Sequence, residues 1–306
     1  MYYLGIDGGG TKTAFTLIDE NKEIIFQSRK SGAFYLQTGL EAIKILITEG
    51  INEAIEQTHI EPIDIAYVFI GLPGYGEVAA DQSKIEAMVA SAMGDMKYHL
   101  GNDVEAGWAG SLACKAGIHL VAGTGAIAFG MDDNGNQART SGWNHIFGDE
   151  GSAYWVAIQG LQAYSKQKDG RMKKTSLIDI FDQELELDEP FEMIGLIHDT
   201  YNADRDKIAA LAKFVSKAAK QGDAVALNIF KQAAYEYYLM VQAISNQLQF
   251  NGVIPISYSG GVFNAKEYIL PHLKQYLAEH HINAQLCTPK FDPEYGAALY
   301  AHRLAK

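Results

Sequence analysis

The sequence predicts an α/β protein made of two related halves, and three observations carry this prediction. Apolar runs of strand length alternate with segments of helical periodicity, which is typical of βαβ units and a largely parallel sheet. Several of these runs end in glycine-rich turns. A strand, glycine turn and second strand near the N-terminus return as the same pattern at residues 118–131, which indicates two structurally related halves.

The composition is that of a globular protein of 306 residues, and it suggests about two domains. A net charge of −12 argues against a broad nucleic-acid or anionic-membrane surface, because both need a basic face. No uncharged apolar run approaches the ~20 residues of a membrane span, and no secretory signal is visible. The only cysteines, Cys114 and Cys287, indicate neither a disulfide scaffold nor a Cys-ligated metal site. We therefore expect a cytoplasmic protein without a nucleic-acid or membrane partner.

The N-terminal segment is the most informative part of the chain. The apolar run Tyr2–Ile6 meets the acid Asp7, and Gly8–Gly10 then precede a second apolar run, Phe15–Ile18. Consecutive glycines let backbone N–H groups approach an anion, and a carboxylate at the strand end can hold a hydrated Mg²⁺. The segment is either a phosphate-binding hairpin or an ordinary glycine-rich turn. P-loop and Rossmann spacings are absent, and a strand rather than a helix follows the glycines.

Strands and helices alternate through the rest of the first half. The expected elements are a strand at 24–28, a helix at 40–55, a strand at 65–70 before Gly71–Gly76, a helix at 85–93 and a strand at 98–100. The pattern restarts at Ile118, so we place the first lobe at residues 1–116 and the second at 117–292. A C-terminal helix at 293–306 is expected to complete the first lobe.

The second half repeats the hairpin and then becomes mostly helical. The strand Ile118–Ala122, the turn Gly123–Gly125 and the strand Ala126–Met131 form the repeated unit. A helical insertion is expected at about 153–250, followed by a strand that ends at Gly260–Gly261. Glycine turns after apolar strands describe a cleft lined by strand ends, where open α/β sheets bind ligands.

Asp103 follows the short strand at Tyr98–Leu100 and is the candidate general base. A carboxylate at this position can accept a hydroxyl proton during phosphoryl transfer. It can equally be the N-cap of the helix that follows. The local sequence leaves both interpretations open, and they are compatible.

The segment Gly142–Trp155 combines acids, a histidine, an amide and two tryptophans between glycines. A carboxylate beside an aromatic face suits a polyol, whose hydroxyls need charged acceptors and whose C–H face needs a flat surface. Alternatively, the segment is a helix start capped by Asp149 or Ser152, with at least one Trp in the core. His145 is expected to be structural rather than a metal ligand.

Four segments in this order resemble a known family. They are Gly5–Thr13, Ala122–Gly125, Gly142–Trp155 and Ser259–Val262. The chain is similar to the N-acetylglucosamine kinase and BadF-BadG-BcrA-BcrD-type ATPases of the actin–sugar kinase–heat-shock chaperone superfamily, over essentially its whole length. The resemblance implies two ribonuclease-H-like lobes with ATP between them and an ATP-dependent kinase that acts on the 6-hydroxyl of an amino sugar.

The resemblance also implies roles for individual residues. Asp103 matches the catalytic base, and Asp7 positions Mg²⁺ through water. The residues facing the phosphates are Gly9, Gly10, Thr11, Lys12, Thr124 and Gly125. The residues near the adenosine are Gly260, Gly261 and Asn264, and those of the sugar segment are Gly142, Trp143, Asn144 and Asp149. A homodimer is expected.

Two departures from the family pattern keep alternatives open. The family's sugar-contacting Asn is missing near Phe34 and Tyr35, so N-acetylglucosamine, glucosamine and a muramic-acid-type sugar all remain candidate acceptors. Neither cysteine lies in the motif with which the redox activators bind an iron–sulfur cluster. A regulatory ATPase that acts on a partner enzyme is the alternative function, and a non-catalytic sugar sensor is a third.

Overall fold

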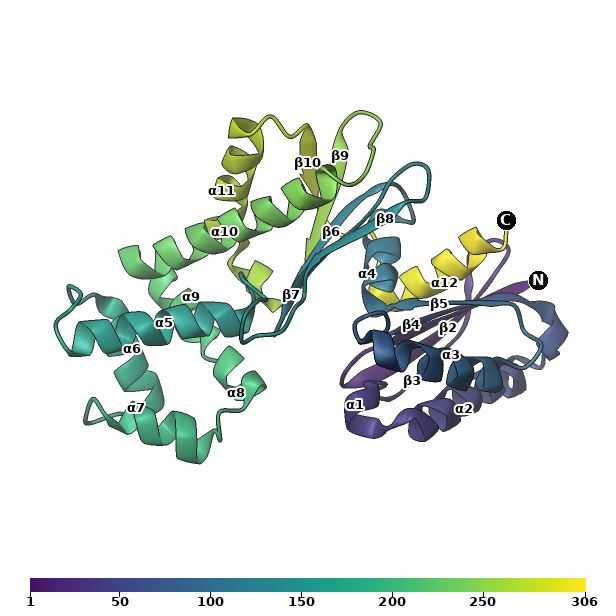
Figure 1. The fold of residues 1–306 in the computed structure, drawn as a ribbon, viewed down its shortest axis with the longest axis horizontal. Helices are drawn as coiled ribbons and strands as arrows, with labels where there is room; N and C mark the ends of the chain where they lie inside the picture. Colours follow the sequence, from purple (N-terminus) through teal and green to yellow (C-terminus); the bar gives the residue numbers. More distant parts are fainter. The chain divides into compact units, whose positions relative to one another are not determined.

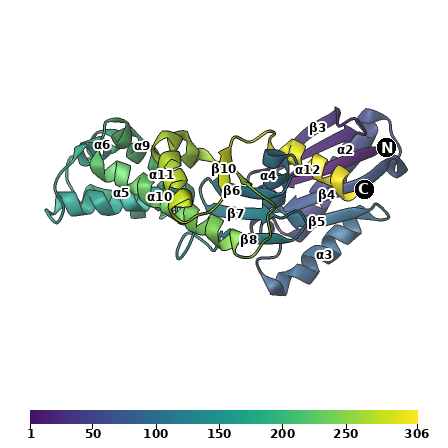
Figure 2. The same cartoon turned by 90° about the horizontal axis from the view of Figure 1, so that it is seen from above.

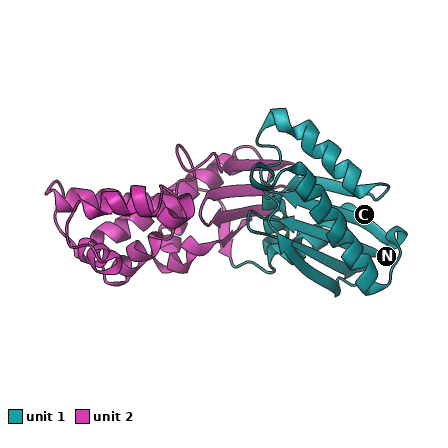
Figure 3. Cartoon of the chain, turned by 90° about the horizontal axis from the view of Figure 1, so that it is seen from below, with its two compact units in different colours: residues 1–116, 288–306 teal, residues 117–287 magenta.

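The computed structural model describes residues 1–306, which divide into two compact units. Unit 1 comprises Met1–Ala116 and Thr288–Lys306, and unit 2 comprises Gly117–Cys287 (Figure 3). Residues 288–292, which we expected in the second lobe, group with unit 1. The reason is local, since the backbone N–H groups of Lys290 and Phe291 donate to the carbonyls of Ser111 and Gly110.

Unit 1 is built on a five-stranded mixed sheet in the order β3-β2-β1-β4-β5. The strands are β1 (Tyr2–Gly8), β2 (Lys12–Asp19), β3 (Ile24–Ser31), β4 (Ile65–Leu72) and β5 (Tyr98–Asn102). The first three are antiparallel, while β4 and β5 continue parallel to β1. The predicted largely parallel sheet is therefore mixed, because two hairpins join its first three strands.

Helices cover both faces of this sheet (Figure 1). They are α1 (Tyr35–Thr38), α2 (Leu40–Thr58), α3 (Ala79–Met93), α4 (Asp103–Leu112) and α12 (Pro293–Leu304), with a 3₁₀ turn at Pro62–Asp64. α2 and α3 cover the face that carries Leu4 and Ile6, and α4 and α12 cover the other. α12 packs directly on β1, where a Cβ on Gly5 would lie 2.1 Å from the backbone nitrogen of Ala298.

Unit 2 repeats the sheet of unit 1. Its strands are β6 (Gly117–Ala122), β7 (Ala126–Met131), β8 (Gln137–Ser141), β9 (Ile254–Ser259) and β10 (Ala284–Cys287). The order β10-β9-β6-β7-β8 again joins an antiparallel meander to two parallel strands. The prediction of an α/β fold with two related halves is confirmed.

A helical block lies between β8 and β9 (Figure 2). It contains α5 (Ala153–Lys168), α6 (Ser176–Leu185), α7 (Glu192–Gly195), a π-helical turn at Leu196–Thr200, α8 (Arg205–Ala209), α9 (Ala212–Lys220) and α10 (Ala224–Ser245). α10 packs on the β6–β8 meander, and a 3₁₀ turn at Gly261–Ala265 leads from β9 to α11 (Lys266–Glu279). None of the helices combines the length and the hydropathy that a membrane span needs.

Candidate functional site

In unit 1, the candidate acids meet where three neighbouring strands end. Asp7 pairs with Gly71 at the carboxyl ends of β1 and β4, and α4 starts with Asp103 directly after β5. The backbones are close enough that a Cβ on Gly8 would lie 2.6 Å from the carbonyl oxygen of Gly71. A Cβ on Gly71 would in turn lie 3.2 Å from the Cα of Asp103. The sheet thus brings both acids to one edge, where parallel strands of α/β proteins present ligand sites.

Asp103 does not cap α4, so the N-cap interpretation of this residue is wrong. The cap is Asn102, whose Oδ1 accepts a hydrogen bond from the backbone nitrogen of Val104 at 3.2 Å. Glu105 completes a capping box, because its Oε1 accepts from the Asn102 backbone nitrogen at 2.9 Å. Asp103 occupies the first turn of α4, where a carboxylate is favoured by the helix dipole.

Asp7 lies in an electrostatically crowded position. Burial is the largest cause that raises the pKa of the Asp7 carboxyl to about 7. The nearby charges of Asp103 and Glu294 raise it further, and the ammonium group of Lys12 lowers it. A carboxylate surrounded by more negative than positive charge favours a divalent cation beside it.

The glycine turn after β1 is held by backbone contacts and leaves its tip exposed. The backbone nitrogen of Gly9 donates to the carbonyl oxygen of Lys12 at 2.8 Å, and that of Ala33 donates to the Gly9 carbonyl at 2.9 Å. A Cβ on Gly32 would lie 2.1 Å from the Gly10 carbonyl oxygen, so the next chain segment fits tightly below the turn. Gly10 and Thr11 are exposed, which leaves their backbone groups accessible to an anion.

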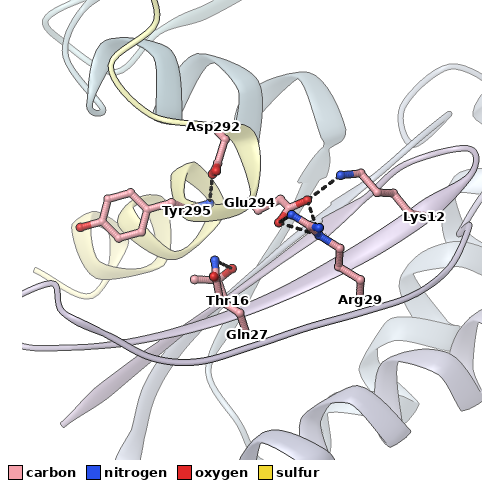
Figure 4. Close-up of polar contacts among 7 residues, drawn as sticks. All are labelled: Lys12, Thr16, Gln27, Arg29, Asp292, Glu294 and Tyr295. Atoms are coloured by element: carbon pink, nitrogen blue, oxygen red, sulfur yellow. Dashed lines mark hydrogen bonds and ion pairs between the residues drawn. The ribbon is translucent and has the colours of Figure 1, made fainter.

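Lys12 contacts a carboxylate that the sequence analysis did not identify. Its Nζ donates to Oε1 of Glu294 at 2.6 Å, and Arg29 binds the same carboxylate (Figure 4). Glu294 is the second residue of α12, and Arg29 lies on β3. The sequence carried only a weak signal for this cluster, namely an acid at the start of a helix rich in small residues.

Phe34 and Tyr35, which stand near the place of the missing Asn, lie against the turn after β4. A Cβ on Gly74 would be 3.2 Å from a ring carbon of each side chain. The Tyr35 hydroxyl also donates to Oδ2 of Asp81 at 3.2 Å. An aromatic pair therefore occupies the loop in which the family pattern has an amide.

In unit 2, the second glycine turn lies at the start of α5. The backbone nitrogens of Ala153 and Tyr154 donate to the carbonyls of Gly123 and Thr124, at 2.8 and 3.4 Å. Ser152 caps this helix by accepting from the Trp155 backbone nitrogen at 3.1 Å, so the capped-helix interpretation of this segment holds for Ser152. The first backbone nitrogens of α5 are thus bonded within the protein, and the positive end of the helix dipole lies at the second glycine turn.

The turn expected near the adenosine lies beside the second glycine turn. Gly260 has φ +102°, and a Cβ there would lie 2.3 Å from the carbonyl oxygen of Ala122. Only glycine fits this approach without strain. Gly261 and Asn264 follow in the 3₁₀ turn, and both are exposed.

Asp149 is buried and paired with a cation that the sequence analysis missed. Its Oδ2 accepts from Nη2 of Arg205 at 2.6 Å, and the two side chains are 5% and 39% exposed. Burial raises the pKa of Asp149, and the Arg205 charge opposes this effect. A Cβ on Gly125 would lie 2.6 Å from Arg205 Nη2 and 2.9 Å from Asp149 Oδ2, so the pair packs on the second glycine turn.

The part of the Gly142–Trp155 segment that precedes Asp149 is a largely exposed loop. Arg139 donates to the carbonyl oxygen of Gly142 at 3.0 Å, and Asn144 Oδ1 accepts from the Ile146 backbone nitrogen at 3.1 Å. Trp143 is 73% exposed and so presents a flat apolar face to solvent.

Phe147 is also exposed, at 70%, whereas His145, Tyr154 and Trp155 are less exposed. Trp155 is half-buried and packs against the core of unit 2, so neither tryptophan of the segment is fully buried. The ring of His145 packs edge-on against Tyr154, with 4.8 Å between the ring centroids.

The family comparison agrees with these features. The model of the BadF/BadG/BcrA/BcrD ATPase family matches residues 4–301. The chain belongs to this family. The predicted family resemblance is thereby confirmed.

Named relatives of this BadF/BadG/BcrA/BcrD-family protein are sugar kinases. An N-acetylmuramic acid/N-acetylglucosamine kinase from Clostridium acetobutylicum is 31% identical over 98% of both chains. An N-acetyl-D-glucosamine kinase from Dictyostelium discoideum is 27% identical over 98% of this chain and 97% of its own. A provisionally named N-acetylglucosamine kinase from Chromobacterium violaceum shares the fold, with a TM-score of 0.74, 23% identity and 98% coverage of each chain.

The donor set of this family member fits a magnesium ion bound through few protein ligands. No group of three or more His, Cys, Asp or Glu side chains is arranged to hold a metal ion. Mg²⁺ commonly binds through one or two carboxylates together with water and substrate phosphates. Asp7, at the base of the exposed Gly10–Thr11 tip, provides such a carboxylate.

Proposed function

We propose that this protein is an ATP-dependent kinase that phosphorylates an amino sugar. The observation that carries the proposal is the placement of Asp7, near the end of β1, and Asp103, after β5, at one edge of the sheet beside the exposed glycine turn of unit 1. Phosphoryl transfer needs little covalent chemistry from the protein, but it needs a positioned base and fixed groups around the phosphates. The names of the sugar-kinase relatives support the same class of reaction.

In this mechanism Asp103 is the general base. It accepts the proton of a sugar hydroxyl, which we take to be the 6-hydroxyl, as the sugar oxygen attacks the γ-phosphorus in line. The bond from the γ-phosphorus to the bridging oxygen breaks, and ADP leaves with that oxygen. The backbone N–H groups of Gly10, Thr11, Thr124 and Gly125, with Lys12, bind the phosphate oxygens whose charge is redistributed. Gly9 shapes the turn instead, because its N–H already donates to the Lys12 carbonyl oxygen.

Asp7 would hold Mg²⁺ through a water molecule. When bound, this ion would neutralise phosphate charge and orient the phosphate chain. A bound Mg²⁺ would also account for an acid among other acids, because its charge would lower the pKa of the Asp7 carboxyl, which burial raises.

Unit 2 would supply the remaining binding groups. Gly260, Gly261 and Asn264 would lie along the adenosine, and the loop of Gly142, Trp143 and Asn144 with Asp149 would contact the sugar. The candidate acceptors are N-acetylglucosamine, glucosamine and a muramic-acid-type sugar. We further propose that the protein acts as a homodimer, in keeping with our expectation from the sequence.

The test is sugar-dependent ADP release by wild type and by the Asp103→Asn variant, measured across a panel of amino sugars. We expect turnover to fall by about 10²–10⁴-fold, because a general base typically contributes that much. Asp95→Asn changes an exposed acid of the same unit and should leave turnover unchanged. Wild-type turnover in Asp103→Asn would overturn the assignment of the base. ATP hydrolysis that does not depend on any sugar would instead favour a regulatory ATPase.

A further inference from the structure

The carboxylate of Glu294 connects two cations of unit 1. We propose that Glu294 and Arg29 are positioning residues that hold Lys12 while the site is free of nucleotide and release it to the phosphate chain of ATP. This inference rests on the proposed function, because it assigns a task to residues around the same nucleotide site. No step of the chemistry is changed by it.

The two cations bind Glu294 in different ways. Arg29 engages both oxygens, with Nε 2.9 Å from Oε1 and Nη2 2.9 Å from Oε2. Lys12 makes one bond, from Nζ to Oε1 at 2.6 Å, and so shares an oxygen that Arg29 already binds (Figure 4). Paired donors of this kind fix a carboxylate more firmly than a single ammonium group does.

Glu294 is buried while its two cations are exposed, so the carboxylate needs a cation that stays in place. The Glu294 side chain is 7% exposed, whereas those of Lys12 and Arg29 are 56% and 65% exposed. A buried carboxylate that loses its only cation is strongly destabilising. Because Arg29 stays in place, Lys12 can leave Glu294 without leaving the carboxylate unpaired.

The backbone places Lys12 at the end of the glycine turn that follows β1. Lys12 is the first residue of β2, and its carbonyl oxygen accepts from the backbone nitrogen of Gly9 at 2.8 Å. Its strand neighbour on the same face, Ala14, pairs with Arg29, so both cations lie on the α12 face of the sheet. A long, mostly exposed lysine stem can therefore turn from Glu294 toward the exposed tip at Gly10 and Thr11.

The charge state of Glu294 is consistent with this arrangement. Burial alone would raise the pKa of its carboxyl, but the hydrogen bonds from Arg29 and Lys12 outweigh burial and lower it. Glu294 is thus ionised near neutral pH and attracts Lys12 whenever no phosphate competes. An arriving phosphate chain carries more negative charge than one carboxylate that Arg29 has already neutralised.

The experiment measures the affinity for a non-hydrolysable ATP analogue with Mg²⁺, and the KM and kcat for ATP, in four variants. Arg29→Gln leaves Lys12 as the only cation on Glu294, so we expect nucleotide affinity to fall about tenfold, with KM raised and kcat little changed. Glu294→Gln frees Lys12 and should bind at least as tightly as wild type. The double variant should return to within about twofold of Glu294→Gln. Lys30→Gln is the control and should change neither value, because Lys30 lies next to Arg29 on β3 but pairs with Glu53 of α2.

A merely structural role predicts a different pattern. If the loss in Arg29→Gln persists after Glu294→Gln is added, the positioning role is wrong. Where Glu294→Gln does not fold, Arg29→Lys gives a second decision, because it keeps one cation on Glu294 but loses the paired donors. It should weaken nucleotide affinity in wild type and have no further effect in the Lys12→Gln background. If the variants change nucleotide affinity as expected but no sugar stimulates ADP release, the positioning role of Glu294 and Arg29 is supported and the proposed function is overturned. Wild type that binds no nucleotide would overturn both.

Discussion

The carboxylate of Asp149 is paired with the guanidinium of Arg205, and this contact fixes an acid of the Gly142–Trp155 segment. Asp149 has φ +57° and lies in a loop between glycines, where a flexible acid would be free to move. Arg205 fixes it from α8, and both side chains pack on Gly125. If Asp149 contacts the sugar, Arg205 sets the orientation of that contact.

We predict that Arg205→Gln is more destabilising than Asp149→Asn. The first variant leaves a nearly buried carboxylate without its cation, and we expect the free energy of unfolding to fall by about 2 kcal/mol, which allows for the partial exposure of Arg205. The second leaves a partly exposed guanidinium that water can solvate, so its cost should be smaller. Urea unfolding of both variants at neutral pH measures the difference. Equal costs, or the reverse order, would show that Arg205 does not carry the charge of Asp149.

Some site residues were predictable from the sequence, and others were not. Asp7 and Asp103 were predictable as candidates because each follows an apolar strand next to glycine or a helix start. The pairing of Arg29 with Glu294 was not, because 265 positions separate these residues and only the packing of α12 on the sheet brings them together. Local patterns indicate where a chain turns, but not which distant side chain will meet it.

At the scale of elements, β6 and β9 are joined by a buried histidine that ties the sheet to the turn at Gly260. His119 Nδ1 lies 2.8 Å from Ser257 Oγ, and Nε2 lies 3.0 Å from Ser259 Oγ. Ser257 pairs with His119 across parallel strands, and Ser259 directly precedes Gly260. The neutral ring can donate from one nitrogen and accept at the other, which satisfies both hydroxyls.

This histidine should make unit 2 sensitive to acid. Burial lowers the pKa of His119 to about 4, whereas an unfolded histidine titrates near pH 6.5. Between these two pH values His119 binds a proton in the unfolded chain but stays neutral in the folded chain. The free energy of unfolding should therefore be unaffected by His119 above pH 6.5 and fall by up to about 3 kcal/mol as the pH drops toward 4.

The comparison of wild type with His119→Asn across pH 7.5 to 4.5 isolates this effect. The variant is less stable at neutral pH, but we expect the difference to shrink as the pH falls, because only wild type loses the contribution of a neutral ring. His281→Asn, at an exposed turn with φ +56°, is the matched control. Parallel stability curves for wild type and His119→Asn would contradict the prediction.

The elements themselves were largely predictable, while their order in the sheets was not. Apolar periodicity located most strands and helices, since each element buries a face whose spacing is visible in the sequence. Whether a sheet is parallel or mixed depends on which strands pair. Each unit begins with an antiparallel meander of three strands, but the strands and helices that alternate after it led us to expect a largely parallel sheet. The helix cap at Asn102 was missed because two adjacent polar residues fit the same role, and only the backbone geometry separates them.

At the scale of the whole molecule, the chain leaves unit 1 at Ala116 and returns to it at Thr288. The two ends of the chain therefore lie in one unit, whereas unit 2 is continuous (Figure 3). The two units have separate apolar cores. Unit 1 is thus complete only when its last helix, α12, has joined the segment Met1–Ala116.

The contribution of α12 to unit 1 is large for a short helix. It covers one face of the sheet with buried small side chains and with Tyr300, which packs against Phe69 and Trp108. Burying one such aromatic side chain contributes about 2–3 kcal/mol. The backbone of Ala298 approaches Gly5 so closely that no larger residue fits at position 5. Without α12, this apolar face would be exposed to water.

We therefore predict that residues 117–287 fold alone, whereas residues 1–116 fold only when residues 288–306 are supplied through a flexible linker. The physical reason is that unit 2 contains its whole core, while the first fragment lacks one layer of its own. Circular dichroism with thermal unfolding of the three fragments tests this, and a linked fragment carrying Tyr300→Ala is the control. That control should melt well below the linked parent, because it loses the aromatic group that fills the layer. A cooperative transition of residues 1–116 alone at the temperature of the linked fragment would show that α12 is dispensable. Absence of a transition in residues 117–287 would show that unit 2 depends on the rest of the chain.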